Sequence, residues 1–135
     1  MRGPGVPVDK RVSVLTGNID LAATIVDAAE AKPRRILDGA SLRELARNPG
    51  AFTRRAIMLE NWPEAGVRRR WYDAIRKDGY KYVEYRSGAR ELYDLVSDPF
   101  EERSVHDDPR YSGVRSQLAD ELQPLRHCAG ATCRR

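Results

Sequence analysis

The stretch Tyr72–Leu95, YDAIRKDGYKYVEYRSGARELYDL, decides the architecture, because it predicts three short strands joined by two tight turns. Asp78-Gly79 is a strong hairpin signal, since a two-residue type I′ turn requires positive φ at both positions. Ser87-Gly88 supplies the second turn. The predicted strands are Trp71–Arg76, Tyr80–Tyr85 and Arg90–Leu95, of which the second is rich in aromatic and β-branched residues. The stretch predicts an antiparallel meander and contains no reactive set of side chains.

Two further elements complete the sheet layer. Ala56–Glu60 is a candidate fourth strand, and Asp108-Pro109 predicts the start of a final helix, with aspartate as N-cap and proline in the first turn. Pro124 should end or kink that helix, because it lacks an amide hydrogen and clashes with the preceding turn. The expected buried stripe of the helix is Tyr111, Val114, Leu118, Leu122 and Leu125. The fold class is therefore α+β, a small four-stranded antiparallel sheet with a C-terminal helix on one face.

The N-terminal part predicts a strand followed by two helices. Arg11–Thr16 alternates loosely and is expected to be a short strand. Asp20 or Asn18 can accept hydrogen bonds from the first free amides of a helix. Ser41 and Glu44 match a capping box for a short second helix, which Asn48-Pro49-Gly50 ends. The first helix is expected to reach about Ala31, with Leu21, Ile25, Ala28 and Ala29 on its apolar face.

Composition limits the class of protein. The 135 residues suffice for one domain or a large piece of one, with 41% hydrophobic and 33% charged residues. The net charge is only +4 and both signs are interspersed, so no nucleic-acid partner is expected. No window holds the ~18 apolar residues that a membrane span needs. No apolar leader follows Met1, and the sequence leaves the compartment open.

Six short segments follow one another along the chain: RGPGVP at 2–7, NIDLAATI at 18–25, LDGASL at 37–42, IRKDGYKYV at 75–83, ELYDL at 91–95 and SDPFE at 97–101. Taken in this order, they resemble the C-terminal part of the sulfatase (arylsulfatase) family. The resemblance implies a sulfuric-ester hydrolase with an alkaline-phosphatase-like α/β fold. It implies two pieces: residues 1–50 as the incomplete tail end of the catalytic α/β domain, contributing a strand and a helix, and residues 51–135 as the C-terminal subdomain.

The catalytic signature of that family is absent from the sequence. Sulfatases convert the Cys or Ser of a C/S-x-P-x-R motif to formylglycine, and hold calcium or magnesium with an Asp-Asp pair and an Asp-Asn pair. Neither Cys128 nor Cys133 is followed by Pro and Arg at the required spacing, and no Asp-Asn pair occurs. Asp107-Asp108 is interpreted as a helix start. No catalytic, metal-binding or substrate-binding residue is assigned, no cofactor is expected in this chain, and the chain looks truncated.

The histidines and cysteines leave alternatives open. His106 lies in a polar loop and is expected to be solvated. His127, Cys128 and Cys133 supply three of the four ligands that a structural zinc site needs. A small disulfide between Cys128 and Cys133, closing a C-terminal loop, is the better interpretation under oxidising conditions, and two inert thiols are expected otherwise. The tail at 126–128 and 133–134 also resembles that of some arylsulfatases.

Three other groups admit a functional and a structural interpretation. The acidic pairs Glu101-Glu102 and Asp107-Asp108 are expected to be caps and solvated charge rather than general acids. Tyr80, Tyr82, Tyr85 and Tyr93 are expected to pack across strands rather than stack on a ligand. A third group, Arg54, Arg55, Arg68–Arg70 and Trp71, borders the substrate cleft in the family picture, and the alternative for it is solvated loop charge.

Two functions follow as expectations. The first is the C-terminal, structural portion of a sulfatase, unable to hydrolyse sulfate esters alone. The second is an interaction module that docks on a separate sulfatase half or another protein, or self-associates, because the helix from Leu21 and the segment Val12–Leu15 would expose apolar faces. The substrate of the parent enzyme is not encoded in these residues.

Overall fold

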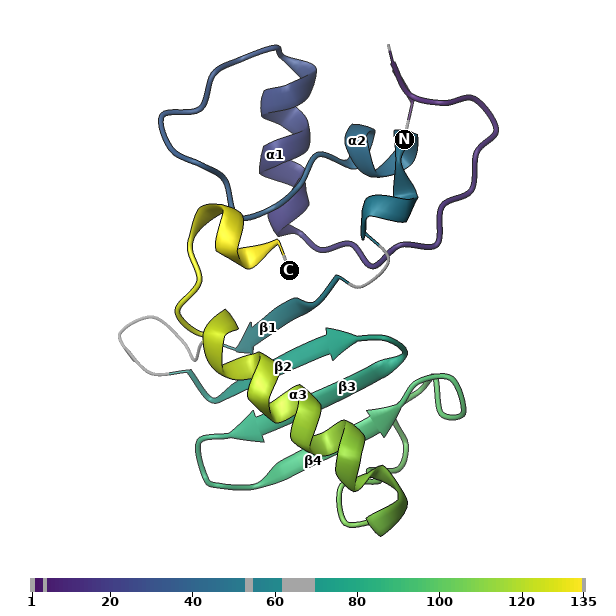
Figure 1. The fold of residues 1–135 in the computed structure, drawn as a ribbon, viewed down its shortest axis with the longest axis vertical. Coiled ribbons are helices and arrows are strands. Elements are labelled where there is room, and N and C mark those ends of the chain that lie inside the picture. Colours follow the sequence, from purple (N-terminus) through teal and green to yellow (C-terminus); the bar gives the residue numbers. More distant parts are fainter. Residues whose placement is uncertain (1, 4, 53–54, 62–69, 135) are drawn as a thin grey trace. The chain divides into compact units, whose positions relative to one another are not determined.

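The computed structural model describes every residue except 1, 4, 53–54, 62–69 and 135, and it divides the chain into two units (Figure 1). The first unit comprises Met1–Ile57 with Cys128–Arg135, and the second comprises Met58–His127. The last residues of the chain therefore belong to the same unit as its N-terminal part. Two long-range contacts lie within this unit, since Arg55 pairs with Asp20 and Gly130 binds Asp38.

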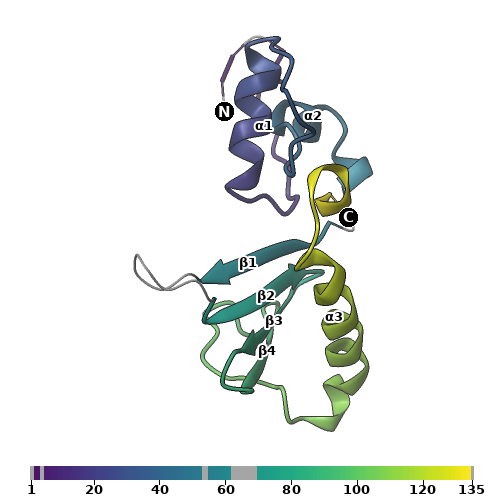
Figure 2. The ribbon, with the colours of Figure 1, turned by 90° about the vertical axis from the view of Figure 1, so that its left-hand side faces the viewer.

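The second unit is a four-stranded sheet in the order β1-β2-β3-β4, with a helix over one face (Figure 2). Its strands are β1 (Ile57–Asn61), β2 (Tyr72–Lys77), β3 (Tyr80–Tyr85) and β4 (Arg90–Asp94), and the helix is α3 (Ser112–Leu125). The predicted α+β class is confirmed. In the described part of the chain, no helix has the length and apolar character needed to cross a bilayer.

The β2–β3 hairpin sets the register of the sheet. Asp78 and Gly79 have φ values of 47° and 83°, so the predicted type I′ turn is confirmed. Ile75 pairs with Tyr82, which pairs in turn with Leu92 on β4. Alternation along the strands places these three on the same face as Asp73, which contacts α3 through Arg126. They form the core of this unit together with three leucines of α3, Leu118, Leu122 and Leu125.

The final helix begins in two steps. The Asp108 carboxylate accepts a hydrogen bond from the Arg110 amide, and Pro109–Tyr111 forms a 3-10 turn before α3 starts at Ser112. Pro124 lies in the last turn of the helix, which ends one residue later. The predicted cap and the predicted stop are both confirmed.

The first unit contains α1 (Ile19–Ala28), α2 (Leu42–Arg47), a 3-10 turn at Pro49–Phe52 and another at Gly130–Cys133. The predicted strand at Arg11–Thr16 is wrong, since these residues form no strand. A strand is stable only beside a partner strand, and the described residues of this unit supply none next to this segment.

The two predicted helix caps also differ from the structure. Asn18 stands at the N-cap of α1 but makes no side-chain cap bond, and Asp20 lies within the first turn, where it accepts from the Gly17 amide. At α2, the Ser41 side chain caps the helix by accepting from the amide of Arg43. The cap therefore differs from the reciprocal capping box that was expected between Ser41 and Glu44. Asp20 and Ser41 also make contacts with residues farther away in the sequence.

Candidate functional site

A buried ion pair organises the first unit. Asp20 is fully buried, and Arg55 binds it through two hydrogen bonds, with Nη1 2.7 Å from Oδ2 and Nη2 2.5 Å from Oδ1. The amides of Gly17 and Ala40 each donate to the same carboxylate at 2.9 Å. Burial alone would raise the pKa of Asp20, but the hydrogen bonds from Arg55 and the two amides outweigh it and lower the pKa. One carboxylate thus joins three distant segments.

Arg55 therefore differs from its expected role. The sequence placed it in an arginine group facing a substrate or solvent, whereas its side chain is only 2% exposed and is bound within the protein. Arg54, Arg68 and Arg69 lie outside the described residues. Arg70 pairs with Asp73 at 3.0 Å and with Glu60, and Trp71 is 63% exposed. Among the described members, the structure assembles no arginine site for an anion.

The turn at Leu37–Gly39 lies directly against the start of α1. A Cβ added to Gly39 would stand 2.1 Å from the carbonyl oxygen of Ile19, far inside van der Waals contact. Only glycine permits this approach, which brings the Ala40 amide to Asp20.

A second set of polar contacts fixes α2 on α1. The Ser41 hydroxyl donates to Asp27 Oδ2 at 2.6 Å, and Arg43 Nη1 donates to the carbonyl of Asp27 at 2.9 Å. The Thr24 hydroxyl donates to the Asp20 carbonyl and accepts from the Leu42 amide at 2.8 Å. Thr24 and Ser41 thus accept from free amides at the start of α2. We interpret Ser41 and Asp27 as a structural contact between the two helices and not as catalytic groups.

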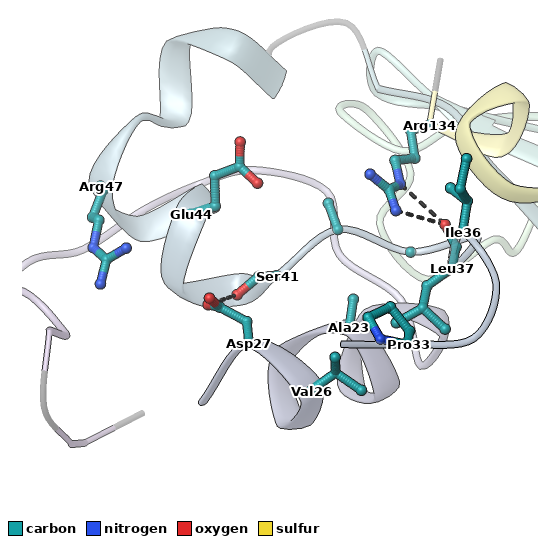
Figure 3. A pocket seen from close by; sticks show the side chains of 12 residues that line it. Ala23, Val26, Asp27, Pro33, Ile36, Leu37, Ser41, Glu44, Arg47 and Arg134 are labelled. Carbon is teal, nitrogen blue, oxygen red and sulfur yellow. Dashed lines mark hydrogen bonds between the residues drawn. The ribbon is translucent and has the colours of Figure 1, made fainter. Parts of the chain in front are cut away.

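A pocket of about 510 Å³ opens between these helices and the 33–40 segment (Figure 3). Apolar side chains of Ala23, Val26, Pro33 and Leu37 line it, and Glu44 and Arg134 extend toward it from different segments. Arg134 Nη2 donates to the Leu37 carbonyl at 2.6 Å. The described residues include no group of three or more His, Cys, Asp or Glu side chains placed to hold a metal ion. The pocket can accept a side chain or a small polar group. Ser41 and Asp27 also line it, and they are the same pair that holds α2 on α1.

The outward face of α1 is apolar and open. Leu21 is 56% exposed and Ile25 is 68% exposed. Ala22, Ala28 and Ala29 are exposed on the same side, whereas the two acids of the helix, Asp20 and Asp27, make the contacts described above. The predicted apolar stripe thus exists, but it is exposed in this chain and not buried. A helix without a polar face normally packs against other structure on all sides.

The C-terminal tail, residues 128–134, packs on the same segment that lines the pocket. A disulfide joins Cys128 to Cys133, with the Cα atoms 5.1 Å apart. The Gly130 amide donates to Asp38 Oδ1 at 2.6 Å. With both sulfurs in this bond, neither is a thiolate that could bind zinc with His127.

The tyrosines of the second unit pack against other side chains. Tyr72 and Tyr85 face each other across β2 and β3 with ring centroids 5.7 Å apart, and Tyr80 meets Tyr111 of the turn before α3 at 6.4 Å. On the same face as Tyr85 lies Tyr93, with Lys81 Nζ 5.8 Å from its ring centre. These contacts agree with cross-strand packing.

Tyr82, which is itself buried, takes part in a part-buried polar network between the sheet and the end of α3. Its hydroxyl donates to Glu84 at 2.8 Å, and burial together with this carboxylate raises the pKa of Tyr82 to about 12. Burial would raise the pKa of Glu84 as well, but hydrogen bonds from Arg126 and Tyr82 lower it. Arg126 also pairs with Asp73 at 2.9 Å, so the network ties α3 to β2 and β3.

The remaining candidates show no catalytic arrangement. His106 was expected to be solvated, but its ring is half-buried and stacked 6.2 Å from that of Tyr82; His127 is exposed. Among the acidic pairs, Asp108 caps the final helix and Glu101 pairs with Lys81. The segment 97–101 has Ser and Pro at the spacing of the sulfatase motif but Glu101 where that motif has Arg. The Ser97 hydroxyl donates to the Asp94 carbonyl on an exposed turn.

Comparison with known proteins gives a consistent result. A family model described as "N-sulphoglucosamine sulphohydrolase, C-terminal" matches residues 1–128. An arylsulfatase of Chlamydomonas reinhardtii is 39% identical over 64 residues, which are 47% of this chain and 10% of that protein. An ulvan-active sulfatase of Formosa agariphila is 26% identical over 123 residues, 88% of this chain and 24% of that protein. The chain therefore spans a quarter or less of these relatives.

A solved structure shares the fold. It is a protein in complex with its substrate D-glucosamine-2-N,6-O-disulfate, and it superposes with a TM-score of 0.76 and 22% sequence identity. The match covers 90% of this chain and 26% of the other. At this identity the likeness concerns the fold alone.

Proposed function

Because the chain belongs to the family of N-sulphoglucosamine sulphohydrolase C-terminal regions, we propose that it is the supporting C-terminal part of a sulfatase and does not hydrolyse sulfate esters by itself. The observation that carries the second half of this proposal is the sequence, which has no C/S-x-P-x-R motif and no Asp-Asn pair. The serine nearest to that pattern, Ser97, has Glu101 in the place of the arginine. The residues present thus do not fit a formylglycine or its calcium or magnesium ion.

The polar network of the first unit supports the structural role. Among the described residues of this unit, Asp20 and Arg55 are the charged groups that are buried. They bind each other, Asp20 also accepts from two backbone amides and Arg55 also donates to the Leu15 carbonyl, so neither is available to a substrate. A residue that stabilises a charge in a transition state must face the reacting group. In the described residues these charges instead hold the 15–20, 38–40 and 55 segments together.

The test is an activity assay of the purified full chain. We expect no turnover of an aryl sulfate, such as 4-nitrophenyl sulfate, above that of a heat-unfolded sample, with calcium or magnesium added. Turnover that stays with the chain through successive purification steps would contradict the proposal. A positive control with a complete sulfatase in the same buffer excludes a failed assay.

A second function, docking on a larger protein, is favoured by the outward face of α1. Leu21, Ala22, Ile25, Ala28 and Ala29 present no polar group to a neighbour, and an exposed apolar helix face of this kind marks an interaction surface. We propose that in a complete sulfatase this face packs against the α/β body, and that without such a body the chain self-associates through it.

Sedimentation velocity of the chain and two single variants tests the docking function. Ile25→Lys places a charge on the face, and Val96→Lys is the matched control, because Val96 is 82% exposed in the second unit. We expect the wild-type chain and Val96→Lys to self-associate with rising concentration and Ile25→Lys to remain monomeric. A folded wild-type chain that is monomeric at every concentration would count against docking through α1. It would not affect the proposed supporting role, which the activity assay tests separately.

A further inference from the structure

The tail at 128–134 forms a closed ring that lies across the 36–38 segment. The disulfide joins Cys128 to Cys133, and Cys133 is only 7% exposed. Within the ring, Gly130 has a φ of 59°, a conformation that side chains other than glycine rarely adopt. A Cβ at Gly130 would stand 3.1 Å from Ile36 side-chain atoms, so the ring packs closely on this segment.

Two groups of the tail bind this segment through hydrogen bonds. The Gly130 amide donates to Asp38 Oδ1 at 2.6 Å, and Arg134 donates to the Leu37 carbonyl from Nη2 at 2.6 Å and from Nε at 3.2 Å. All three hydrogen bonds are exposed to solvent, so each contributes little net free energy by itself. They form together only if the backbone between Gly130 and Arg134 is already in the bound conformation, and the ring supplies this preorganisation.

The same tail closes one side of the pocket of the first unit. Arg134, Ile36 and Leu37 line the pocket, and Glu44 extends toward it from α2 (Figure 3). Release of the tail would therefore remove the guanidinium of Arg134 from the pocket and uncover the 36–38 segment.

We propose that the Cys128–Cys133 disulfide is a redox-sensitive fastening that keeps the C-terminal tail on the 36–38 segment and the pocket closed on that side. A dithiol reductant transfers two electrons and two protons to the Sγ–Sγ bond. Two Sγ–H groups form, and the reductant becomes a disulfide. Once the ring is open, the tail regains the conformational freedom of its backbone, which the exposed hydrogen bonds do not offset. The tail then leaves the segment while α1, α2 and the second unit stay folded.

Hydrogen exchange of the ¹⁵N-labelled full chain, oxidised and after reduction with dithiothreitol, tests this proposal. We expect exchange at the Gly130 amide to accelerate by about tenfold or more on reduction, while amides of Tyr82 and Val83 in β3 keep their protection. Cys128→Ser, at the half-buried cysteine, should reproduce the reduced state without reductant. Asp38→Ala, which keeps the disulfide but removes the acceptor, should accelerate Gly130 alone.

Three results would overturn the proposal. One is unchanged exchange at Gly130 when mass spectrometry after alkylation shows two free thiols. Another is an equal loss of protection at Gly130 and in β3, which would make the disulfide a general stabiliser rather than a local fastening. The third is an air-oxidised chain in which both cysteines react fully with iodoacetamide.

Discussion

Each of the two units of this chain is stabilised internally by a different kind of contact. In the second unit, the sheet and α3 share an apolar core made of Ile75, Tyr82, Leu92 and three leucines of the helix. Among the described residues of the first unit, half of the buried apolar side chains are alanines, and the buried carboxylate of Asp20 joins the segments through Arg55 and two amides. The second unit is thus built on an apolar core, whereas the first is joined mainly by polar contacts around Asp20 and leaves the outer face of α1 open.

Removing the cation from the polar centre should have the largest effect. Arg55→Met leaves the Asp20 carboxylate buried without its charged partner, and breaking a buried pair in this way costs about 4 kcal/mol. We expect amides of α1 and α2 to lose protection from hydrogen exchange in low urea, while those of β3 keep it.

The control for this variant is a solvent-exposed ion pair. Arg110 binds Asp108 with its side chain 83% exposed, and such pairs contribute little. Arg110→Ala should leave the urea profile of both units unchanged. If Arg55→Met behaves like Arg110→Ala, the ion pair does not organise the first unit.

Truncating the apolar core should destabilise the second unit more than the first, which is the reverse of the pattern expected for Arg55→Met. Leu122 is completely buried, and Leu122→Ala should destabilise the second unit by about 3 kcal/mol through lost burial and the cavity left behind. Val96→Ala, at an 82% exposed position, is the control and should shift the urea midpoint little. Equal loss of protection in both units would show that they unfold as one.

Gly39→Ala tests the close approach to α1 and should have a smaller effect. The added Cβ would meet the Ile19 carbonyl at 2.1 Å, so the turn must move away from the helix, at a cost of about 2 kcal/mol. Gly113→Ala in α3 is the matched control, because a Cβ there meets nothing within 4 Å. It should be neutral or slightly stabilising in urea denaturation followed by circular dichroism.

Acid should weaken both units, with the smallest effect of the series. The pKa values of Asp20 in the first unit and of Glu84 and Glu121 in the second are lowered in the folded state. Their stabilisation is complete above the unfolded pKa values, which are 3.8 for Asp20 and 4.5 for the two glutamates, and is lost as the pH falls through the lower folded values.

The measurement is the urea midpoint between about pH 6 and pH 3, read separately for each unit. Glu121→Gln should flatten the pH dependence of the second unit only, because Glu121 pairs with Lys77 within that unit. A midpoint that rises as the pH falls would contradict the assignment of these carboxylates.

Much of the second unit could be predicted because its signals are local. The Asp78-Gly79 turn, the strand at Tyr80–Tyr85 with its aromatic and β-branched residues, and the Asp108-Pro109 start each depend on neighbours in sequence, and the structure confirms them. The sulfatase resemblance rests on the order of short motifs and is confirmed by the family match over residues 1–128.

The first unit was predicted less well because its contacts join residues far apart in sequence. Asp20 looks like a cap when only its neighbours are considered, and Arg55 looks like a loop charge. The strand expected at 11–16 requires a neighbouring strand to pair with, and no local sequence pattern can guarantee that neighbour. A signal was present, since LDG at 37–39 and the aspartate of NIDLA at 18–22 belong to the motifs of the resemblance, but spacing alone does not show that they meet.

Periodicity, turn residues and motifs are properties of neighbouring positions, so the amino-acid order was enough to predict the family, the antiparallel meander with its final helix, and the lack of a sulfatase nucleophile motif. Three contacts became known from the folded chain alone: Arg55 pairs with Asp20, Gly39 lies on the first turn of α1, and the tail returns to Asp38. Hydrogen bonds and steric contacts act over a few ångströms, so which distant residues meet is fixed by the path of the folded chain.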